Sequence, residues 1–372
     1  MSHLLKPVKL TDALTLRNKV VMAPMTTWSA DPAGNVSTQE LDFYQKRSNG
    51  VGMVITGTTY VSQNGIGFEN QFGGWDDKFI PSLTRLAEAA KSGGAPAILQ
   101  IFHAGDKAIA ELTPNEEIVS ASAVQLEQTS SNGLPITTRA LNDDEVWQMV
   151  KDFGQGVRRA IMAGFDGVEL HGAHGFLIQN FFSPLYNQRH DYWGGSLEKR
   201  MNFPLEVVKE AKRIIAKYAT KPFALGYRIS LEEAESHGLR IDDSLQLIDA
   251  LIAQDISYLH VSLGDLLGYK PIDKQVSTTS IELVSQHVNK RIPVIAAGSI
   301  KLPSQAEQAL QLGVDFVAVG QGLVINPNWV ELAQSGQSGL IEQSIDLSNT
   351  PLPDGLVHYI RSWTGWFNIK TA

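Results

Sequence analysis

The segment from Asp166 to Arg200 reads DGVELHGAHGFLIQNFFSPLYNQRHDYWGGSLEKR. Its first residues form a short apolar run that ends at His171, and a second histidine, His174, follows three residues later. A turn then leads to Gly-Gly-Ser, in which Ser196 is a favourable residue to start a helix. This order predicts a buried parallel strand whose carboxyl end carries two imidazoles, both able to donate a hydrogen bond to one oxygen atom.

Short β-branched runs alternate with longer amphipathic segments along the chain, which is typical of repeated β-α units and a parallel sheet. Eight strands are expected, over Lys19–Ala23, Gly52–Gly57, Ala97–Phe102, Gly167–His171, Phe223–Ile229, Tyr258–Ser262, Pro293–Ala297 and Phe316–Gly320. Helices are expected over Thr38–Ser48, Ile80–Lys91, Asp143–Ala163, Leu197–Tyr218, Asp242–Gln254, Thr278–Val288 and Pro303–Leu312. The pattern predicts an α/β fold, a (β/α)8 TIM barrel, as a single domain over residues 1–372.

Two segments depart from this alternation. Residues 105–140, between the third strand and its helix, are long for a barrel loop, and Ser131-Asn-Gly-Leu-Pro135 predicts a hairpin within them. Long loops at the carboxyl end of a barrel usually shape access to its site, so this extended loop is expected near the substrate. The tail beyond Gln334 is polar and then turns aromatic, at Trp363, Trp366 and Phe367.

The composition is that of a globular protein, with 43% hydrophobic residues. A net charge of −8 argues against binding to nucleic acid, for which a basic face is expected. No apolar run approaches the roughly 18 residues of a membrane span, and the first residues lack the apolar core of a signal peptide. The absence of cysteine excludes disulfides, iron–sulfur clusters and a thiolate nucleophile. We therefore expect a soluble, cytoplasmic protein.

The catalytic groups of such barrels lie where the strands end. The expected strand ends carry an arginine, two histidines, an amide and two glycine turns, but no pair of carboxylates of the kind that glycosidases use. The turns at Gly298 and Gly320 lie where barrels bind phosphate through backbone N–H groups, although glycine there can also simply make a tight turn. Arg228 needs a partner, either a structural acid or an anionic ligand. Gln100 can donate and accept together, which suits a ring edge with both functions.

The two histidines have three interpretations. They could chelate zinc, but no glutamate follows His171 as in His-Glu-x-x-His, and His103 is the only other nearby candidate ligand. They could also be two satisfied histidines packed at a strand end. Donors that polarise a carbonyl are the favoured interpretation, because one preorganised donor to a developing oxyanion contributes on the order of 10²–10³ in rate. No metal site is predicted.

The 166–200 segment resembles the old yellow enzyme family of FMN-dependent ene-reductases, and so do Asn18-Lys-Val-Val-Met-Ala-Pro-Met-Thr26, Gln100-Ile-Phe-His-Ala-Gly105 and Gly-x-Gly-x-x-x-Asn-Pro327. The resemblance covers essentially the whole chain. It implies an FMN-dependent NAD(P)H oxidoreductase in which NADH or NADPH reduces FMN, whose N5 then delivers hydride to an activated alkene. His171 and His174 would bind the substrate carbonyl, and Arg228 would stabilise the negative charge of reduced flavin. The residues implied to surround FMN are Pro24, Met25, Thr26, Gly57, Gln100, Arg228, Gly298, Ser299, Gly320 and Gln321.

The substrate side departs from the family at Phe176. This position usually holds a tyrosine that protonates the substrate α-carbon, and phenylalanine has no proton to give. Either water or another hydroxyl takes over, or the reaction needs no such acid, as with nitro, quinone or free-flavin acceptors. Trp28 stands where one branch of the family has an aromatic residue that lines the substrate pocket, so it is expected there with Phe176. The other candidate proton donors are Tyr60, Tyr186 and Tyr227.

The cofactor side departs at two positions. Thr26 stands where that branch commonly has cysteine, so flavin tuning would rest on a hydroxyl group. Gln321 stands where the family usually has an arginine on the flavin phosphate. A charge-assisted contact worth about 1.5–3 kcal/mol thereby becomes a neutral one, so a lower affinity for FMN is expected unless a different cation compensates.

Two other functions stay open at this stage. One is a non-catalytic or sensory FMN-binding barrel, suggested by Phe176. The other is a barrel lyase or aldolase with a phosphorylated substrate, although no expected strand end carries the lysine that a Schiff base needs. A small molecule is the expected partner in each case. The sequence does not predict the physiological substrate or the choice between NADH and NADPH. It also does not predict the oligomeric state, although a homo-oligomer is possible, in which Arg361 could enter a neighbour's site.

Overall fold

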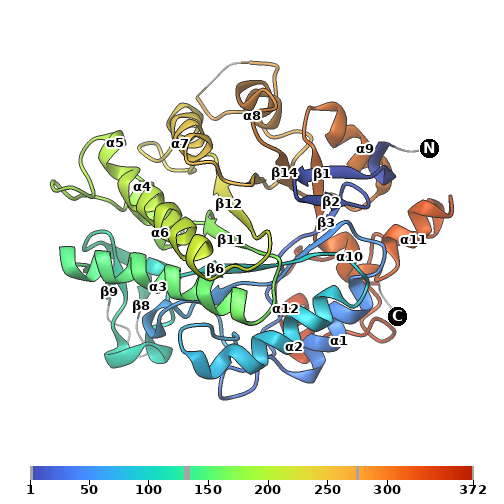
Figure 1. Ribbon diagram of the computed structural model, residues 1–372, viewed down its shortest axis with the longest axis horizontal. Helices are drawn as coiled ribbons and strands as arrows, with labels where there is room; N and C mark the ends of the chain where they lie inside the picture. The colour runs from blue at the N-terminus through green and yellow to red at the C-terminus, as the bar shows by residue number, and fades with distance from the viewer. Residues whose placement is uncertain (1–2, 130–134, 274–275, 371–372) are drawn as a thin grey trace.

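The computed structural model describes residues 3–129, 135–273 and 276–370, and eight parallel strands close into a barrel at its centre (Figure 1). Strand β11 pairs with both β6 and β12, which closes the ring. The barrel strands are β3 (Val20–Met22), β4 (Met53–Ile55), β6 (Ala97–Phe102), β11 (Gly167–Gly172), β12 (Ala224–Ser230), β13 (Tyr258–Ser262), β14 (Val294–Ala297) and β15 (Phe316–Val319). The predicted (β/α)8 barrel is confirmed, because every expected strand lies within two residues of its expected bounds.

Helices surround the strands and begin where the sequence offers caps. In α1 and α3, Ser37 and Asn142 each accept a hydrogen bond from the backbone of the third helical residue, whose glutamate side chain bonds back. The expected helix over Leu197–Tyr218 is interrupted at Met201, which divides it into α5 and α6. The helices of the outer ring are α1 (Thr38–Arg47), α2 (Ile80–Lys91), α3 (Asp143–Met162), α5 (Leu197–Arg200), α6 (Asn202–Tyr218), α7 (Ile241–Ala253), α8 (Ser280–Val288) and α9 (Pro303–Gln311).

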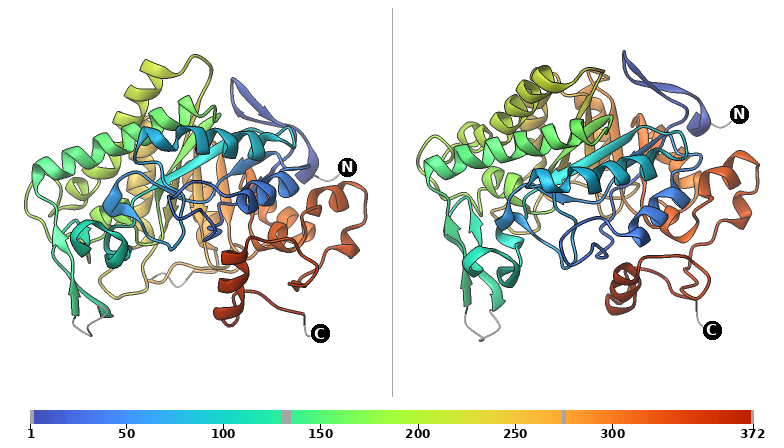
Figure 2. Two further views of the ribbon diagram at one scale, coloured as in Figure 1. Left: turned by 90° about the horizontal axis from the view of Figure 1, so that it is seen from below. Right: turned by 60° about the horizontal axis from the view of Figure 1, so that its bottom comes forward.

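The two ends of the barrel are covered differently. At the amino ends of the strands, the antiparallel hairpin β1 (Val8–Thr11) and β2 (Leu14–Leu16) packs Leu10 and Leu16 against the apolar side chains inside the barrel. Figure 2 places this hairpin on the opposite side of the molecule from the β8–β9 arm and from α12 (Asp354–Ser362). The carboxyl ends of the strands therefore remain the end at which loops can build a site.

The extended loop over residues 105–140 contains four short strands. β7 (Val119–Ser120) pairs in parallel with β10 (Arg139–Ala140), and β8 (Gln125–Thr129) pairs antiparallel with β9 (Pro135–Thr137). The two arms of the expected hairpin are present, and its turn lies outside the described residues. Arg139 joins Glu117 and Glu145 at 2.7 and 2.8 Å, which ties the base of this loop to α3.

The last strand leads into three short helices and an aromatic tail. α10 (Gln321–Ile325) and α11 (Trp329–Gln334) follow β15, and the first residue of α12, Asp354, exchanges hydrogen bonds with Gln39 on α1. Arg47 on α1 is fully buried and donates to the carbonyl oxygens of Leu323, Val324 and Pro351. Its guanidinium therefore joins the first helix to the C-terminal region. A further short helix, α4 (Leu177–Phe182), follows β11.

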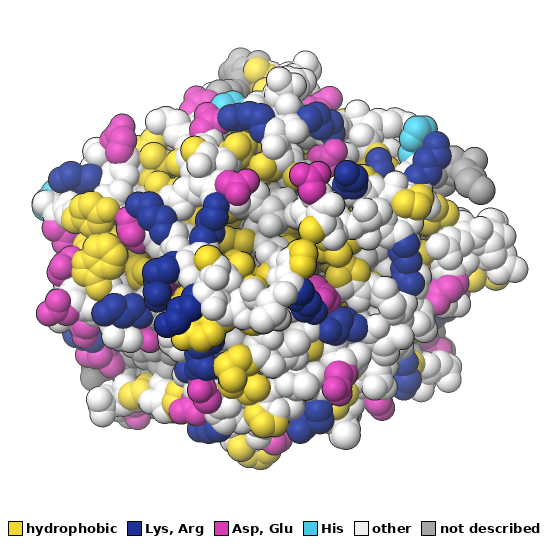
Figure 3. Space-filling model, in the orientation of Figure 1, with side chains coloured by type: hydrophobic (Ala, Val, Ile, Leu, Met, Phe, Trp, Pro, Cys, Tyr) yellow, Lys and Arg dark blue, Asp and Glu magenta, His cyan; other side chains and the backbone are white. Residues whose placement is uncertain are grey.

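The surface carries both signs of charge close together, as the face in Figure 3 shows for Lys, Arg, Asp and Glu side chains. Among the helices of the described chain, none combines the length and apolar character that crossing a bilayer requires.

Candidate active site

Several cavities open at the carboxyl ends of the strands, and two of them together contain most of the predicted residues. The larger of these two, of about 260 Å³, is lined by Pro24, Met25, Arg228, Gly298, Ser299, Gly320 and Gln321, with Ser262 and Trp366 among its other walls. The smaller, of about 80 Å³, is lined by Pro24, Thr26, Thr58, Phe68, Gln100, His171, His174, Phe176 and Arg228. Pro24 and Arg228 belong to both. The barrel thus brings together nearly all the residues that the sequence placed around a cofactor and substrate.

Gly57 and Trp28 do not line either cavity. The Gly57 N–H donates to the Tyr44 hydroxyl at 2.7 Å, and a Cβ at Gly57 would lie 2.5 Å from the Met25 carbonyl oxygen. The Met25 backbone therefore packs directly against Gly57, at a distance that leaves no room for a side chain. Trp28 packs on Tyr359 of the tail, with ring centroids 4.3 Å apart, and Phe68 stands in the cavity wall.

The polar and aromatic wall residues absent from the predicted set are Thr58, Phe68, Ser262 and Trp366. Ser262 could have been predicted, because it is the last residue of an expected strand. Phe68 and Trp366 come from a loop and from the tail, where periodicity gives no signal. His103 is held elsewhere, because its Nδ1 accepts from Gly105 and its Nε2 lies 3.0 Å from Asn64 Oδ1. The described residues contain no group of three acidic or histidine side chains suited to a metal.

His171 presents one ring nitrogen to the small cavity. Its Nδ1 accepts the backbone N–H of Ala173 at 3.3 Å, so the neutral ring carries its hydrogen on Nε2. Burial, with the neighbouring His174 and Arg228, lowers the pKa of His171 well below its ordinary value. The side chain is therefore a neutral hydrogen-bond donor, as a group that polarises a carbonyl should be.

His174 is held on several sides. Its Nε2 lies 2.7 Å from Ser262 Oγ, its N–H donates to Ser230 Oγ, and its carbonyl oxygen accepts from Lys107 at 2.6 Å. Its φ of +61° is unusual for a residue with a side chain. The rings of His171 and His174 are 4.8 Å apart and nearly perpendicular. The expected pair is therefore adjacent, and each ring has one nitrogen that contacts a protein group, the Ala173 N–H for His171 and Ser262 Oγ for His174.

Phe176 lies beside the histidines. Its ring centroid is 5.0 Å from that of His171 and 4.9 Å from that of Phe102, and only 6% of the residue is exposed. The alternative donor Tyr227 precedes Arg228 on β12, so the two side chains face opposite sides of the strand. Tyr227 packs in the apolar cluster between the barrel and the surrounding helices. Tyr227 consequently faces away from the site.

The polar groups of the cavities fit a flavin. Gln100 Oε1 and Arg228 Nε are buried and lack a hydrogen-bond partner within the described residues, which leaves one acceptor and one donor for a ligand edge with N–H and C=O groups. A Cβ at Gly298 would lie 2.6 Å from the Leu266 nitrogen, so only glycine fits there. Gln321 Nε2 donates to the Trp366 carbonyl at 2.6 Å. Its amide is therefore tied to the tail, and the phosphate end would rely on the glycine turns.

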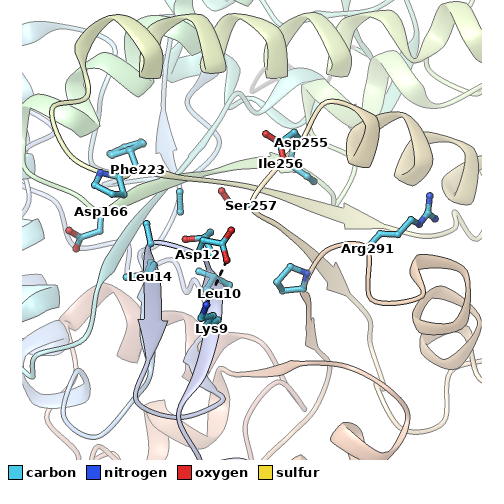
Figure 4. Close-up of a pocket in the computed structure, with 15 residues that line it drawn as sticks. Lys9, Leu10, Asp12, Leu14, Asp166, Phe223, Asp255, Ile256, Ser257 and Arg291 are labelled. Atoms are coloured by element: carbon cyan, nitrogen blue, oxygen red, sulfur yellow. Dashed lines mark ion pairs between the residues drawn. The ribbon is translucent and has the colours of Figure 1, made fainter.

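A separate cavity, of about 770 Å³, lies at the opposite end of the barrel beneath the N-terminal hairpin (Figure 4). Its charged groups are largely paired: Lys9 with Asp12 at 3.8 Å, Arg291 with Asp249, and Asp166 with Lys221 at 2.9 Å. This cavity is larger, but it holds neither the histidines nor the glycine turns. The residues expected to carry the chemistry lie at the carboxyl ends of the strands instead.

A family model for NADH:flavin oxidoreductase / NADH oxidase proteins matches residues 3–339. The chain is 39% identical over 370 residues to a probable NADH-dependent flavin oxidoreductase of Bacillus subtilis strain 168, covering 99% of this chain and 98% of that protein. It is 37% identical to an NADH:acrylate oxidoreductase of Vibrio harveyi, over 91% of this chain but 34% of that longer protein. Morphinone reductase in complex with tetrahydroNAD has a TM-score of 0.78 at 26% identity, with 95% of this chain and 97% of that chain covered.

Proposed function

The chain belongs to the NADH:flavin oxidoreductase / NADH oxidase family and is an FMN-dependent NAD(P)H oxidoreductase, and we propose that its acceptor is a small electron-poor molecule bound beside His171. Nitro, quinone and flavin acceptors are reduced faster than α,β-unsaturated carbonyl compounds. The observation that carries this proposal is the pairing of His171, a neutral donor, with the ring of Phe176 5.0 Å away. The site polarises an acceptor oxygen but offers no phenol at the position where the family protonates carbon.

When bound, FMN supplies hydride transfer at N5, first from NAD(P)H and then to the acceptor. The protein binds and orients the ligands. Pro24, Met25 and the turns at Gly298 and Gly320 form the walls of the larger cavity, and the Arg228 guanidinium offers positive charge there. Phe68, Phe102 and Phe176 contact one another around the smaller cavity and exclude water from the acceptor.

Activated alkenes remain within the proposed range because one relative is an NADH:acrylate oxidoreductase. This chain spans about a third of that protein, 34% of its length. We therefore propose alkene reduction as a second, slower activity of this barrel. The residual proton donors at the smaller cavity are the hydroxyls of Thr26 and Thr58, which are much weaker acids than a phenol.

The lyase alternative lacks its chemistry, because neither the larger nor the smaller cavity has a lysine among its described lining residues.

One anaerobic experiment distinguishes the reductase from a sensory FMN-binding protein. The purified, flavin-loaded protein is titrated with NADH and with NADPH, and bleaching of the flavin absorbance identifies a reductase. Reoxidation of the reduced protein is then followed by stopped flow with 1,4-benzoquinone and with 2-cyclohexenone. Faster reoxidation by the quinone supports the proposal, and an equally fast reaction with the enone contradicts it.

A further inference from the structure

A carboxylate lies inside the barrel directly beneath the proposed flavin site. Glu169 is fully buried on β11, and the register places it beside Gln100 on β6 and Gly226 on β12. A Cβ at Gly226 would lie 2.0 Å from the Tyr258 ring, so the absent side chain leaves that space to Tyr258. Glu169 thereby reaches past β12 to His260 on β13, whose Nδ1 is 2.9 Å from Glu169 Oε2.

The other oxygen of this carboxylate orients Gln100. Gln100 Nε2 donates to Glu169 Oε1 at 2.7 Å. An ionised carboxylate can only accept hydrogen bonds, so the amide must turn its NH₂ group toward Glu169 and its carbonyl oxygen away. That carbonyl oxygen is the buried, unpartnered atom of Gln100, and Gln100 lines the smaller cavity.

Glu169 is held in its charged form. Burial by itself would raise the pKa of the Glu169 carboxyl, but His260, Arg228 and Gln100 together hold that pKa below its ordinary value. Burial lowers the pKa of His260, which Glu169 opposes. Arg228 is the only lysine or arginine among the described residues that line the larger and the smaller cavity. A buried negative charge beneath it weakens the positive potential that Arg228 offers to a ligand.

We propose that Glu169 is a positioning residue that turns the Gln100 carbonyl oxygen toward the flavin and whose negative charge sets the flavin potential in opposition to Arg228. This inference rests on the proposed flavin site. Reduction adds negative charge to the flavin. Removing a nearby negative charge therefore makes reduction easier, and removing a nearby positive charge makes it harder.

Two variants distinguish the effect of the Glu169 charge from the effect of its side-chain length. Glu169→Gln removes the charge and keeps an oxygen that can accept from Gln100, so the midpoint potential of bound FMN should rise while the FMN dissociation constant changes little. Glu169→Asp keeps the charge but is one methylene shorter, so Gln100 loses its partner. The FMN dissociation constant should then rise on the order of tenfold, because the Gln100 carbonyl oxygen is no longer held toward the flavin and its hydrogen bond to the flavin weakens, while the potential stays near that of the wild type. The potentials are measured by dye equilibration and the affinities by fluorescence titration of the apoprotein.

Glu233→Gln is the matched control. Glu233 is also buried, and it accepts hydrogen bonds from Gln179 and Ser183 on and after α4, outside the barrel interior. Its neutralisation should leave the potential unchanged.

Arg228→Ala tests the flavin site itself and should lower the potential. If Arg228→Ala leaves the potential unchanged, the placement of the flavin is wrong. If only Glu169→Gln fails to raise it, or if Glu169→Asp binds FMN as the wild type does, the role of Glu169 is overturned. If Glu169→Gln does not fold, the affinity of Glu169→Asp still decides the positioning role.

Discussion

The Nε2 atom of His174 lies 2.7 Å from the Oγ atom of Ser262, and Arg228 donates to the same hydroxyl at 3.1 Å. One serine thus joins the cation expected on the flavin to one of the two histidines expected on the acceptor. The three residues come from the loop after β11 and from the ends of β12 and β13, which are neighbours in the barrel. A change at Ser262 should therefore be felt on the acceptor side through the orientation of His174.

Replacing Ser262 by alanine should weaken acceptor binding. The His174 ring loses the hydrogen bond that fixes it, at a cost of about 1 kcal/mol, or roughly fivefold in affinity. The dissociation constant of a phenolic ligand, titrated spectroscopically against bound flavin, measures this effect. Ser262→Thr keeps the hydroxyl and should restore binding. An unchanged ligand affinity in Ser262→Ala would mean that packing alone orients His174.

The two histidines should differ in their contributions. His171→Ala removes the donor whose other nitrogen is occupied by the Ala173 N–H, and it should lower acceptor turnover on the order of 10²–10³. His174→Ala should cost less, because the His174 ring can carry its hydrogen on Nε2, where Ser262 Oγ accepts it, instead of on the nitrogen that would donate to the acceptor. Flavin reduction by NAD(P)H, measured separately by stopped flow, should be far less affected in both variants. Equal losses in the two variants would argue for symmetric donation to one oxygen.

Phe176→Tyr should selectively accelerate alkene reduction. Hydride at the β-carbon leaves an enolate that needs a proton at the α-carbon, and a positioned general acid typically contributes 10²–10⁴-fold. The reoxidation rate with 2-cyclohexenone should rise, while the rate with a quinone and the NAD(P)H half-reaction stay nearly constant. If both acceptors respond alike, Phe176 acts only through packing in this cluster.

Glu40→Gln should change how stability depends on pH. Burial raises the pKa of Glu40 from 4.5 to about 7, against the hydrogen bonds from Thr27 and Ser37 that lower it. The folded state therefore holds this proton more tightly than the unfolded state does. The resulting stability is fully present below pH 4.5 and is lost as the pH rises through about 7, at up to about 1.4 kcal/mol per pH unit.

The wild type should accordingly lose stability relative to Glu40→Gln between pH 5 and about pH 7, as measured by urea unfolding. Glu145→Gln is the control, because Glu145 occupies the same capping position in α3 but has a lowered pKa. Its contribution is lost only as the pH falls through the acid range, so its difference from the wild type should be flat over the same interval. A flat difference for Glu40→Gln as well would show that Glu40 is ionised in the folded state.

The barrel and most site positions follow from local patterns. Strands and helices were predicted because the side-chain period of each element is present within a few neighbouring residues. The adjacency of His171 and His174 follows from a spacing of three residues, and the places of Arg228 and Gln100 from the rule that parallel strands present their carboxyl ends together. Such features depend on short stretches of chain, so the order of the residues was sufficient to predict them.

The partners of these residues depend on how the barrel closes. Ser262 meets His174, and Glu169 meets His260, because β13 lies beside β12 and because Gly226 leaves room across that strand. Trp28 was expected in the substrate pocket, but it packs against Tyr359, more than three hundred residues away, and leaves Phe68 in the wall. Gln321 likewise donates to the Trp366 carbonyl oxygen, because the C-terminal tail folds back over the end of β15. Contacts between distant segments arise from the shapes and hydrogen-bonding needs of surfaces that meet only after folding, and no periodicity along the chain encodes them.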